Sequence, residues 1–363
     1  MVRYVSIKDI SLSVASGITK KKASRGKYNV YGSTGIIGYS NLYDYSGVKI
    51  LVARVGANAG TINIVDGKYG VSDNTIIIDV SQQYNVKYVY YQLKYLNLHS
   101  LIFGSGQPLI TGTQLKQLKF RNVELKEQVA IVEALSDIDS LIFSQQKLIE
   151  KKKAIKQGAM QELLTGKKRL PGFCLKWTKR YLKEIIVPRK ERINPAEIDN
   201  RRCIELEHIE PNSGKILGYC ESKEQKSLKT IFYPNDILWG KLRPYLRKYA
   251  HPKFSGVCST EFWVFDSIDQ YACNDFMYYL LQTQDFVSAA NSTTGTKMPR
   301  ADWNLVQELE VKIPTDKNEQ QAIAQVLSDM DSEIEQLEKK LAKYQQIKQG
   351  MMQELLTGRI RLV

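Results

Sequence analysis

The sequence predicts a mixed α/β fold in which one building block, a globular domain followed by a long helix, occurs twice. An internal repeat with a fixed offset of 192 residues is the first observation that predicts it. The second is a sustained apolar spacing of three and four residues within both repeated segments, which is typical of long helices. Strand-like stretches precede each segment. We therefore expect two α/β domains separated by two long helices that form an antiparallel coiled coil, with pseudo-twofold symmetry.

The repeat is strong enough to establish a duplication. Glu127-Gln128 recurs as Glu319-Gln320, and residues 160–166 (MQELLTG) recur unchanged as 352–358. Between 127–170 and 319–362, 25 of 44 aligned positions are identical without a gap. This period is much longer than the roughly 20–50 residues of solenoid repeats, so it indicates two copies of a whole domain.

The repeated segments, 126–169 and 316–363, are expected to be the two long helices. Their apolar seam comprises Ile131, Leu135, Ile138, Ile142 and Ile149 in the first copy, and Ile323, Val326, Met330, Ile334, Leu337, Leu341, Tyr344, Met351 and Leu355 in the second. Charged positions between them are typical of a coiled coil, in which the simplest partner of each helix is the other. Helices packed only on their own domains are the alternative. Gly166 and Gly358 fit the C-terminal ends.

The remaining segments, 1–125 and 170–315, are rich in Tyr, Ile, Val and Gly and are expected to be the globular domains. Predicted strands are Lys49–Ala53 and Thr75–Ile78 in the first, and Asp236–Trp239 and Glu261–Phe265 in the second. Each domain also has a helical stretch, Val86–Leu98 or Asp275–Ala289.

Composition indicates a polyanionic partner. Lysine and arginine total 52 against 38 acidic residues, a net charge of +14, and basic proteins bind nucleic acid by displacing its counterions. A soluble protein that is simply basic is the alternative. The five cysteines are odd in number and lack a CxxC pair, which favours a reducing, cytoplasmic location. No apolar run approaches the ~20 residues of a membrane helix, so we expect no membrane partner.

Signals for catalysis are weak. The sequence has no phosphate-binding GxxxxGK[ST] loop, no GxGxxG after a strand and no Asn-Pro-Pro-aromatic methyltransferase motif. Glu-x-Lys triplets occur at 124–126, 221–223 and 310–312, but such triplets are common by chance in a charged chain. The three histidines lack metal-ligand spacing. We therefore predict no catalytic residues, no metal and no cofactor.

An ordered set of motifs resembles the specificity subunits of type I restriction–modification systems over essentially the whole chain. The motifs are the Glu-Gln helix starts, the LLTG helix ends, Tyr31–Tyr39, Ile50–Gly56, Asp236–Pro244 and the segments around 106–108 and 295–299. The resemblance implies two target-recognition domains, each reading one half of a bipartite site in double-stranded DNA. It also implies helices that act as a spacer and bind two methyltransferase subunits, with an endonuclease–translocase subunit as a further partner. S-adenosylmethionine would bind the methyltransferase, and this chain would not be an enzyme. The first domain lacks a counterpart of Trp177, a departure that affects its N-terminal boundary.

In the first domain, the densest basic cluster is the predicted phosphate contact, comprising Lys20, Lys21, Lys22, Arg25 and Lys27. The turn at Ser33 and Thr34 is expected to approach the DNA backbone closely. Residues that follow predicted strands are candidates for reading bases, namely Arg54, Asn58, Asn74 and Gln107. A solvated charge run beside a hairpin turn is the alternative.

In the second domain, basic residues alternate with aromatic ones after a strand, a pattern expected of a DNA-binding loop. The predicted contacts there are Lys241, Arg243, Tyr245, Arg247 and Lys248. Two further segments contribute Arg189, Lys190 and Arg192, and Thr294, Thr296, Lys297 and Arg300. Solvated loops and an ordinary glycine turn are the alternatives.

Two other functional classes fit parts of the pattern. A stand-alone DNA-binding regulator could use the same fold without methyltransferase partners. A coiled-coil structural protein would explain the helices but would leave the basic domains unexplained.

Overall fold

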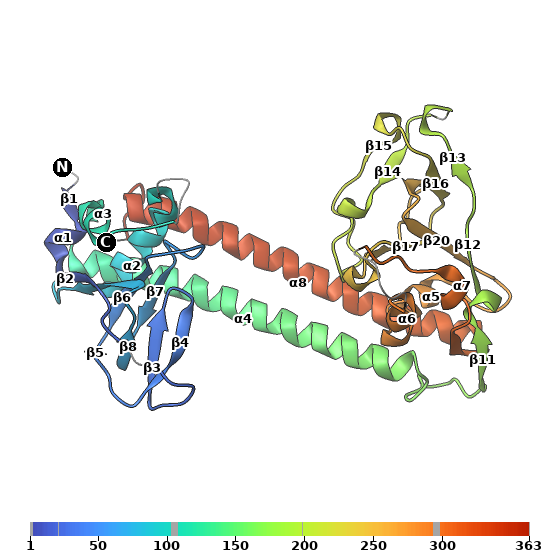
Figure 1. Ribbon diagram of the computed structural model, residues 1–363, viewed down its shortest axis with the longest axis horizontal. Helices are drawn as coiled ribbons and strands as arrows, with labels where there is room; N and C mark the ends of the chain where they lie inside the picture. Colours follow the sequence, from blue (N-terminus) through green and yellow to red (C-terminus); the bar gives the residue numbers. More distant parts are fainter. Residues whose placement is uncertain (1–2, 21, 103–107, 198, 293–297, 363) are drawn as a thin grey trace. The chain divides into compact units, whose positions relative to one another are not determined.

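The computed structural model describes residues 3–20, 22–102, 108–197, 199–292 and 298–362, and Figure 1 shows its elements. The chain divides into two compact units, one comprising residues 1–147 with 338–363 and the other residues 148–337. Each unit contains a globular domain, the first part of the helix that follows it, and the last part of the other helix. The two units are therefore built in the same way, as expected of a duplication. The four segments expected from the sequence differ from these units because they assign each long helix to a single segment.

The first domain contains two four-stranded sheets and a two-stranded pair, with strand orders β2-β9-β6-β7, β4-β3-β8-β5 and β1-β10. The strands are β1 Arg3–Ser6, β2 Ser11–Ser16, β3 Tyr28–Gly32, β4 Gly35–Ser40, β5 Tyr45–Ser46, β6 Lys49–Ala53, β7 Ile62–Val65, β8 Lys68–Val71, β9 Thr75–Val80 and β10 Lys119–Asn122. The helices are α1 Ile7–Ile10, α2 Val86–Tyr95 and α3 Gly112–Gln117, with a 3-10 helix at Leu98–Leu101.

The central strands β6 and β9 are buried on both faces, which explains their nearly continuous apolar sequences. On one face, Ile50 and Ile78 belong to a core that includes Tyr88 of α2. On the other face, Leu51 and Ile77 pack with Tyr69 and its neighbours from the second sheet. The strands predicted at Lys49–Ala53 and Thr75–Ile78 are thus confirmed.

The second domain has the same plan, with strand orders β12-β20-β17-β18, β13-β16-β19-β14-β15 and β11-β21. Its strands are β11 Trp177–Tyr181, β12 Ile186–Pro188, β13 Arg192–Ile193, β14 Arg202–Ile204, β15 Cys220–Glu221, β16 Lys229–Phe232, β17 Ile237–Gly240, β18 Tyr249–Ala250, β19 Gly256–Ser259, β20 Phe262–Ser267 and β21 Glu310–Pro314. Its helices are α5 Asn274–Leu280, α6 Gln284–Ala290 and α7 Trp303–Val306, with short 3-10 helices between strands, among them Pro244–Leu246.

The single helix expected over Asp275–Ala289 is wrong, because the structure has α5 and α6 with a break between them. The hydroxyl of Thr283 donates a hydrogen bond to the carbonyl of Leu280, 2.7 Å away, at the end of α5. The backbone of Thr283 is extended (ψ 155°) and begins α6 as its N-terminal cap. A side chain that donates a hydrogen bond to a nearby backbone carbonyl competes with the backbone hydrogen bonds that would continue the helix.

The two long helices are confirmed as α4 Leu125–Leu163 and α8 Lys317–Thr357. A glycine with a left-handed backbone follows the end of each helix, Gly166 (φ 70°) after α4 and Gly358 (φ 78°) after α8. Within each unit, the start of one helix packs antiparallel against the end of the other. Ion pairs joining Lys152 to Glu333 and Lys156 to Asp331 show this direction in the second unit.

The repeated Glu-Gln motif anchors these helix pairs. The carboxylates of Glu127 and Glu319 are fully buried. Each receives an arginine that follows the end of the other helix: Arg361 Nη2 lies 2.7 Å from Glu127 Oε2, and Arg169 Nη2 lies 2.7 Å from Glu319 Oε2. Because a buried carboxylate requires a charged partner, these ion pairs explain why Glu and Arg recur at the same positions in both copies.

A third group completes each anchor and explains the missing tryptophan. In the second unit, Trp177 Nε1 donates to Glu319 Oε2 across 3.2 Å. In the first unit, Arg121 of β10 takes this place, with its Nη2 3.3 Å from Glu127 Oε1. The first domain therefore needs no tryptophan at its start.

Candidate nucleic-acid interface

A loop leaves the central strand β17 of the second domain and is held by four backbone hydrogen bonds. Its ends are joined by Gly240 N–H to the carbonyl of Lys248 at 2.8 Å. Lys241 donates to Glu261 at 2.7 Å and accepts from Ala301 at 2.9 Å, and Arg243 donates to Pro299 at 2.8 Å. Loop 240–248 is thus fixed against two other segments of the domain.

The first domain holds loop 53–61 in the same way, 187 positions earlier. Ala53 N–H donates to Thr61 at 2.9 Å, Arg54 donates to Asn74 at 3.0 Å and accepts from Ile110 at 2.9 Å, and Gly56 donates to Pro108 at 3.1 Å. No residue of 54–61 is identical to its counterpart in 241–248. The family motifs Ile50–Gly56 and Asp236–Pro244 are corresponding segments of the two copies, and the shared hydrogen bonds bring Arg54 and Lys241 to the same position in the two domains.

Two arginines of loop 240–248 have a left-handed backbone, at Arg243 (φ 52°) and Arg247 (φ 48°). Their counterparts in the first domain are glycines, Gly56 (φ 75°) and Gly60 (φ 89°). A left-handed conformation costs a residue with a Cβ atom about 1–2 kcal/mol, so an arginine there is unfavourable for stability alone. Such strain is typical of functional loops.

The side chains of this loop differ in their surroundings. Arg243 is exposed and has no ion-pair partner within the described part of the chain, and Tyr245 is 56% exposed. Arg247 Nη2 donates to Oε1 of Gln284 at 2.6 Å, and Lys248 Nζ donates to the carbonyl of Leu206 at 2.6 Å. Arg243 and Tyr245 are therefore presented to solvent, whereas Arg247 and Lys248 are tied to the domain.

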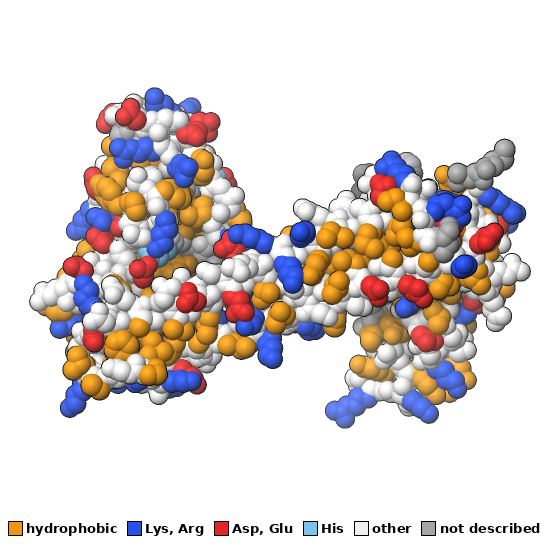
Figure 2. Space-filling view, turned by 180° about the vertical axis from the view of Figure 1, so that it is seen from behind, with side chains coloured by type: hydrophobic (Ala, Val, Ile, Leu, Met, Phe, Trp, Pro, Cys, Tyr) orange, Lys and Arg blue, Asp and Glu red, His pale blue; other side chains and the backbone are white. Residues whose placement is uncertain are grey.

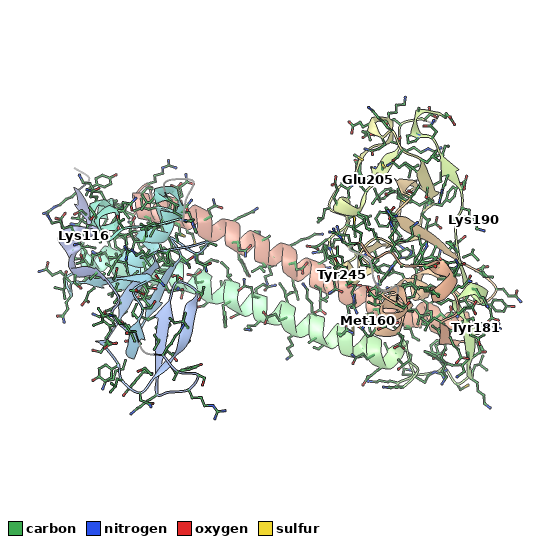
Figure 3. The ribbon with its side chains drawn as sticks, viewed as in Figure 1. Lys116, Met160, Tyr181, Lys190, Glu205 and Tyr245 are labelled. Carbon is green, nitrogen blue, oxygen red and sulfur yellow. The ribbon has the colours of Figure 1, made fainter. Side chains whose placement is uncertain are left out.

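A basic pocket of about 410 Å³ lies beside β17 and collects residues that are far apart in the sequence. Its lining comprises Pro188, Arg189, Lys190, Arg192, Thr230, Lys241, Thr260, Phe262 and Trp263. Figure 3 shows Lys190 and Tyr245 at opposite edges of the second domain. The predicted contacts of this domain thus form two groups, one around the pocket and one on the outer part of loop 240–248.

Carboxylates engage two of the predicted contact residues. Arg189 donates through Nε to Asp236 Oδ2 at 2.8 Å and through Nη2 to Asp266 Oδ2 at 2.7 Å. Arg300 Nη2 donates to Glu261 Oε1 at 2.8 Å. These arginines tie together segments of the second domain, a role that sequence reasoning missed because their partners are distant in the chain. Three further predicted contacts, Thr294, Thr296 and Lys297, lie outside the described residues.

The basic cluster of the first domain lies along one edge of the hairpin formed by β3 and β4. Its described members, Lys20, Lys22, Arg25 and Lys27, are all exposed. Ala23 pairs with Tyr39 of β4 through two backbone hydrogen bonds of 2.8 and 2.9 Å, so the cluster runs beside this strand. Figure 2 shows lysine and arginine side chains, at the lower right, around the end of the domain that carries this hairpin. Lys21 lies outside the described residues.

The other first-domain candidates are dispersed. Ser33 and Thr34 form the turn between β3 and β4, at the opposite end of β4 from Tyr39. Asn58 is exposed on loop 53–61, and Asn74 is exposed next to that loop, where its carbonyl accepts from Arg54 N–H. The Arg54 Nη1 donates to Ser16 Oγ at 3.4 Å. Gln107 lies outside the described residues.

Metal chemistry has no candidate site in the described part of the chain, where no three His, Cys, Asp or Glu side chains gather in a way that could hold an ion. None of the described helices combines the length and apolarity required to cross a membrane.

Comparison with known proteins identifies the two domains. The model of the type I restriction modification DNA specificity domain matches residues 2–156 and 175–349. The MjaVIII specificity subunit of Methanocaldococcus jannaschii is 25% identical over 346 residues, which cover 86% of this chain and 79% of that protein. The EcoprrI specificity subunit of Escherichia coli is 25% identical over 127 residues, 35% of this chain and only 32% of that protein.

Solved structures share the fold. The crystal structure of the S subunit from M. genitalium aligns with a TM-score of 0.64 and 17% identity, covering 98% of this chain and 96% of that one. A chain from a study of complex assembly and conformational transition in a type I R-M system aligns with a TM-score of 0.54 and 12% identity, covering 99% and 98%.

A duplicated DNA specificity domain, on two helices that pair within each unit, defines a non-catalytic DNA-recognition protein. The chain belongs to the family of type I restriction–modification specificity subunits.

Proposed function

We propose that this chain is the DNA-recognition subunit of a type I restriction–modification complex, and that each of its domains reads one half of a bipartite, asymmetric site. The observation that carries the proposal is the pair of loops 53–61 and 240–248. They share a backbone framework but no side chains. A common framework with different side chains is what two readers of different sequences require, because bases are read by side chains in the DNA grooves.

Charge supports double-stranded DNA as the ligand. The chain carries a net charge of +14, and exposed lysines and arginines occur in both domains. Arginine and lysine contacts to phosphates supply most of the sequence-independent affinity of DNA-binding proteins. A stand-alone regulator with this fold would share that property, so the partners of the helices distinguish the two functions.

Two methyltransferase subunits are the proposed partners of α4 and α8, with an endonuclease–translocase subunit as a further partner. Ile155 is 47% exposed, and its repeat counterpart Ile347 is 41% exposed. Leu141 and Phe143 of α4 are also exposed, at 50% and 60%. Contiguous exposed apolar patches mark protein interfaces, and the recurrence of Ile155 as Ile347 at the repeat offset supports two equivalent faces. Leu141 and Phe143 extend the patch on α4 only, since Glu333 and Glu335 stand at the repeat offset. S-adenosylmethionine would bind the partner, and the complex would act in the cytoplasm.

Methylation sequencing of the source genome, with this gene intact or deleted, tests the proposal. A bipartite motif should be methylated only when the gene is intact. Purified chain with S-adenosylmethionine and plasmid DNA should transfer no methyl group until the methyltransferase subunit is added. An unchanged methylome after deletion, with retained DNA binding, would favour the stand-alone regulator.

A further inference from the structure

The pocket beside β17 concentrates positive charge that the described protein leaves uncompensated. Arg189 is neutralised by Asp236 and Asp266. Lys190, Arg192 and Lys241 have no ion-pair partner in the described ranges. Three cations that line one cavity repel one another, and an anion in the cavity would relieve that repulsion.

Lys241 is the least exposed of these three cations. It is half-buried and follows directly from β17, with its backbone fixed to Glu261 and Ala301. Burial lowers the pKa of Lys241, and the neighbouring Arg192 and Arg300 lower it further, against the opposing effect of Glu261. Glu261 itself accepts a hydrogen bond from Arg300, so it is shared between cations.

The rest of the lining suits an anion with several acceptor oxygens. Thr230 and Thr260 add hydroxyl donors, while Phe262 and Trp263 form an apolar wall. Asn and Gln side chains, which pair with adenine, are absent from this lining among the described residues. Lysine, arginine and threonine are among the residues that contact phosphate oxygens in DNA complexes. Exposed Lys190 and Arg192 keep the pocket open to solvent.

We propose that this pocket binds one phosphate group of the DNA backbone, held by Lys241, Arg192 and the two threonines. The inference rests on the proposed function and deepens it, because it separates a positioning contact from the contacts that read bases. A phosphate contact carries no sequence information. The pocket would therefore set the register of the second domain on DNA without choosing the half-site.

The test compares Lys241→Met with Lys241→Arg and with Lys226→Met, which removes an exposed lysine of the same domain outside the pocket. Each variant is assembled with its methyltransferase subunits. Its affinity for a duplex carrying the wild-type motif is measured by fluorescence anisotropy between about 50 and 200 mM salt. Methylation sequencing of cells that express each variant gives the motif.

Lys241→Met should weaken binding about ten-fold at low salt and reduce the log–log salt slope by about 0.9, the value expected when one phosphate is no longer neutralised. The methylated motif should stay the same. Lys241→Arg should keep the wild-type salt slope because it keeps the positive charge, and Lys226→Met should also keep the wild-type slope. Thermal melting checks the fold, and no decrease is expected because no protein ion pair is removed.

Each contrary result has its own meaning. A changed motif in the second half-site would overturn the inference by making Lys241 a base reader, and an unchanged affinity and slope would overturn it by making the pocket a solvated surface. Inorganic phosphate at millimolar concentration is a separate arm: if it stabilises the wild type but not Lys241→Met while the DNA slopes agree, the pocket serves a free phosphate and the DNA assignment is wrong. If the wild-type complex has no bipartite motif, the proposed function itself fails.

Discussion

The ammonium of Lys156 lies 2.5 Å from Oδ1 of Asp331, and the hydroxyl of Tyr279 donates to the other oxygen of that carboxylate at 2.9 Å. The first unit repeats the arrangement with Lys348, Asp139 and Tyr91, at 2.5 and 2.8 Å. Lys156 near the end of α4, and its repeat counterpart Lys348 near the end of α8, each belong to a three-residue network. Each network joins the end of one helix, the start of the other and the globular domain within the same unit.

Replacing Lys156 by Met should destabilise the second unit by about 1–2 kcal/mol, because Asp331 loses a charged hydrogen-bond partner in a partly buried setting. Hydrogen exchange of each unit measures the effect. Lys152→Met removes the more exposed pair with Glu333 and should cost less than about 1 kcal/mol. A double-mutant cycle with Asp331→Asn isolates the pair, and simple additivity of the two effects would contradict the network.

Arg243→Gly should stabilise the second domain while weakening its binding to DNA. Glycine removes the cost of a left-handed arginine, about 1 kcal/mol, and is the residue found at the equivalent Gly56. Thermal melting and DNA affinity are the two measurements. Asn235→Gly is the control, since Asn235 is also left-handed (φ 72°) but carries no charge. An Arg243→Gly variant with unchanged DNA binding would show that this strain has another cause.

Changing Lys22, Arg25 and Lys27 to Ala should weaken binding to specific and non-specific DNA alike. The expected reduction in the log–log salt slope is about 0.9 for each phosphate that the variant no longer neutralises. Lys87→Ala, an exposed lysine on α2, is the control for removal of charge from the same domain. Equal salt slopes in wild type and triple variant would identify the cluster as a solvated surface.

Acid should destabilise the second unit through His251. Burial lowers the pKa of His251 from its ordinary value of 6.5 to about 4, with a further lowering effect from nearby Lys253. The ring stacks on Tyr278, and its Nε2 lies 2.9 Å from the carbonyl of Asn235. Because the unfolded chain binds the proton more tightly, the free energy of unfolding falls as the pH drops from 6.5 towards 4.

The free energy of unfolding should fall by about 2–3 kcal/mol between neutral pH and pH 4.5, since each pKa unit corresponds to about 1.36 kcal/mol. Urea unfolding at about pH 7 and pH 4.5 measures it. His251→Gln, which keeps a donor for Asn235, should lower stability at neutral pH but show a smaller decrease in acid. If wild type and variant lose the same free energy, other groups cause the acid sensitivity.

The sequence by itself determined the duplication, the two long helices and their glycine ends. These features depend on local periodicity and on backbone conformations that favour particular residues, as at Gly166 and Gly358. The repeat also marked Glu127 and Glu319 as important, although their role as buried anchors required the structure.

Only the tertiary structure decided which basic side chains act together. Lys241 meets Arg192 in one pocket because the strands β17 and β13 are brought together in the same domain, while Arg189 is neutralised by carboxylates 47 and 77 residues away. The common backbone framework of loops 53–61 and 240–248 likewise rests on hydrogen bonds to distant segments and on no shared residue within the loops. Charge and hydrogen-bond partners act through space, and side chains distant in the chain become neighbours only when the strands pair.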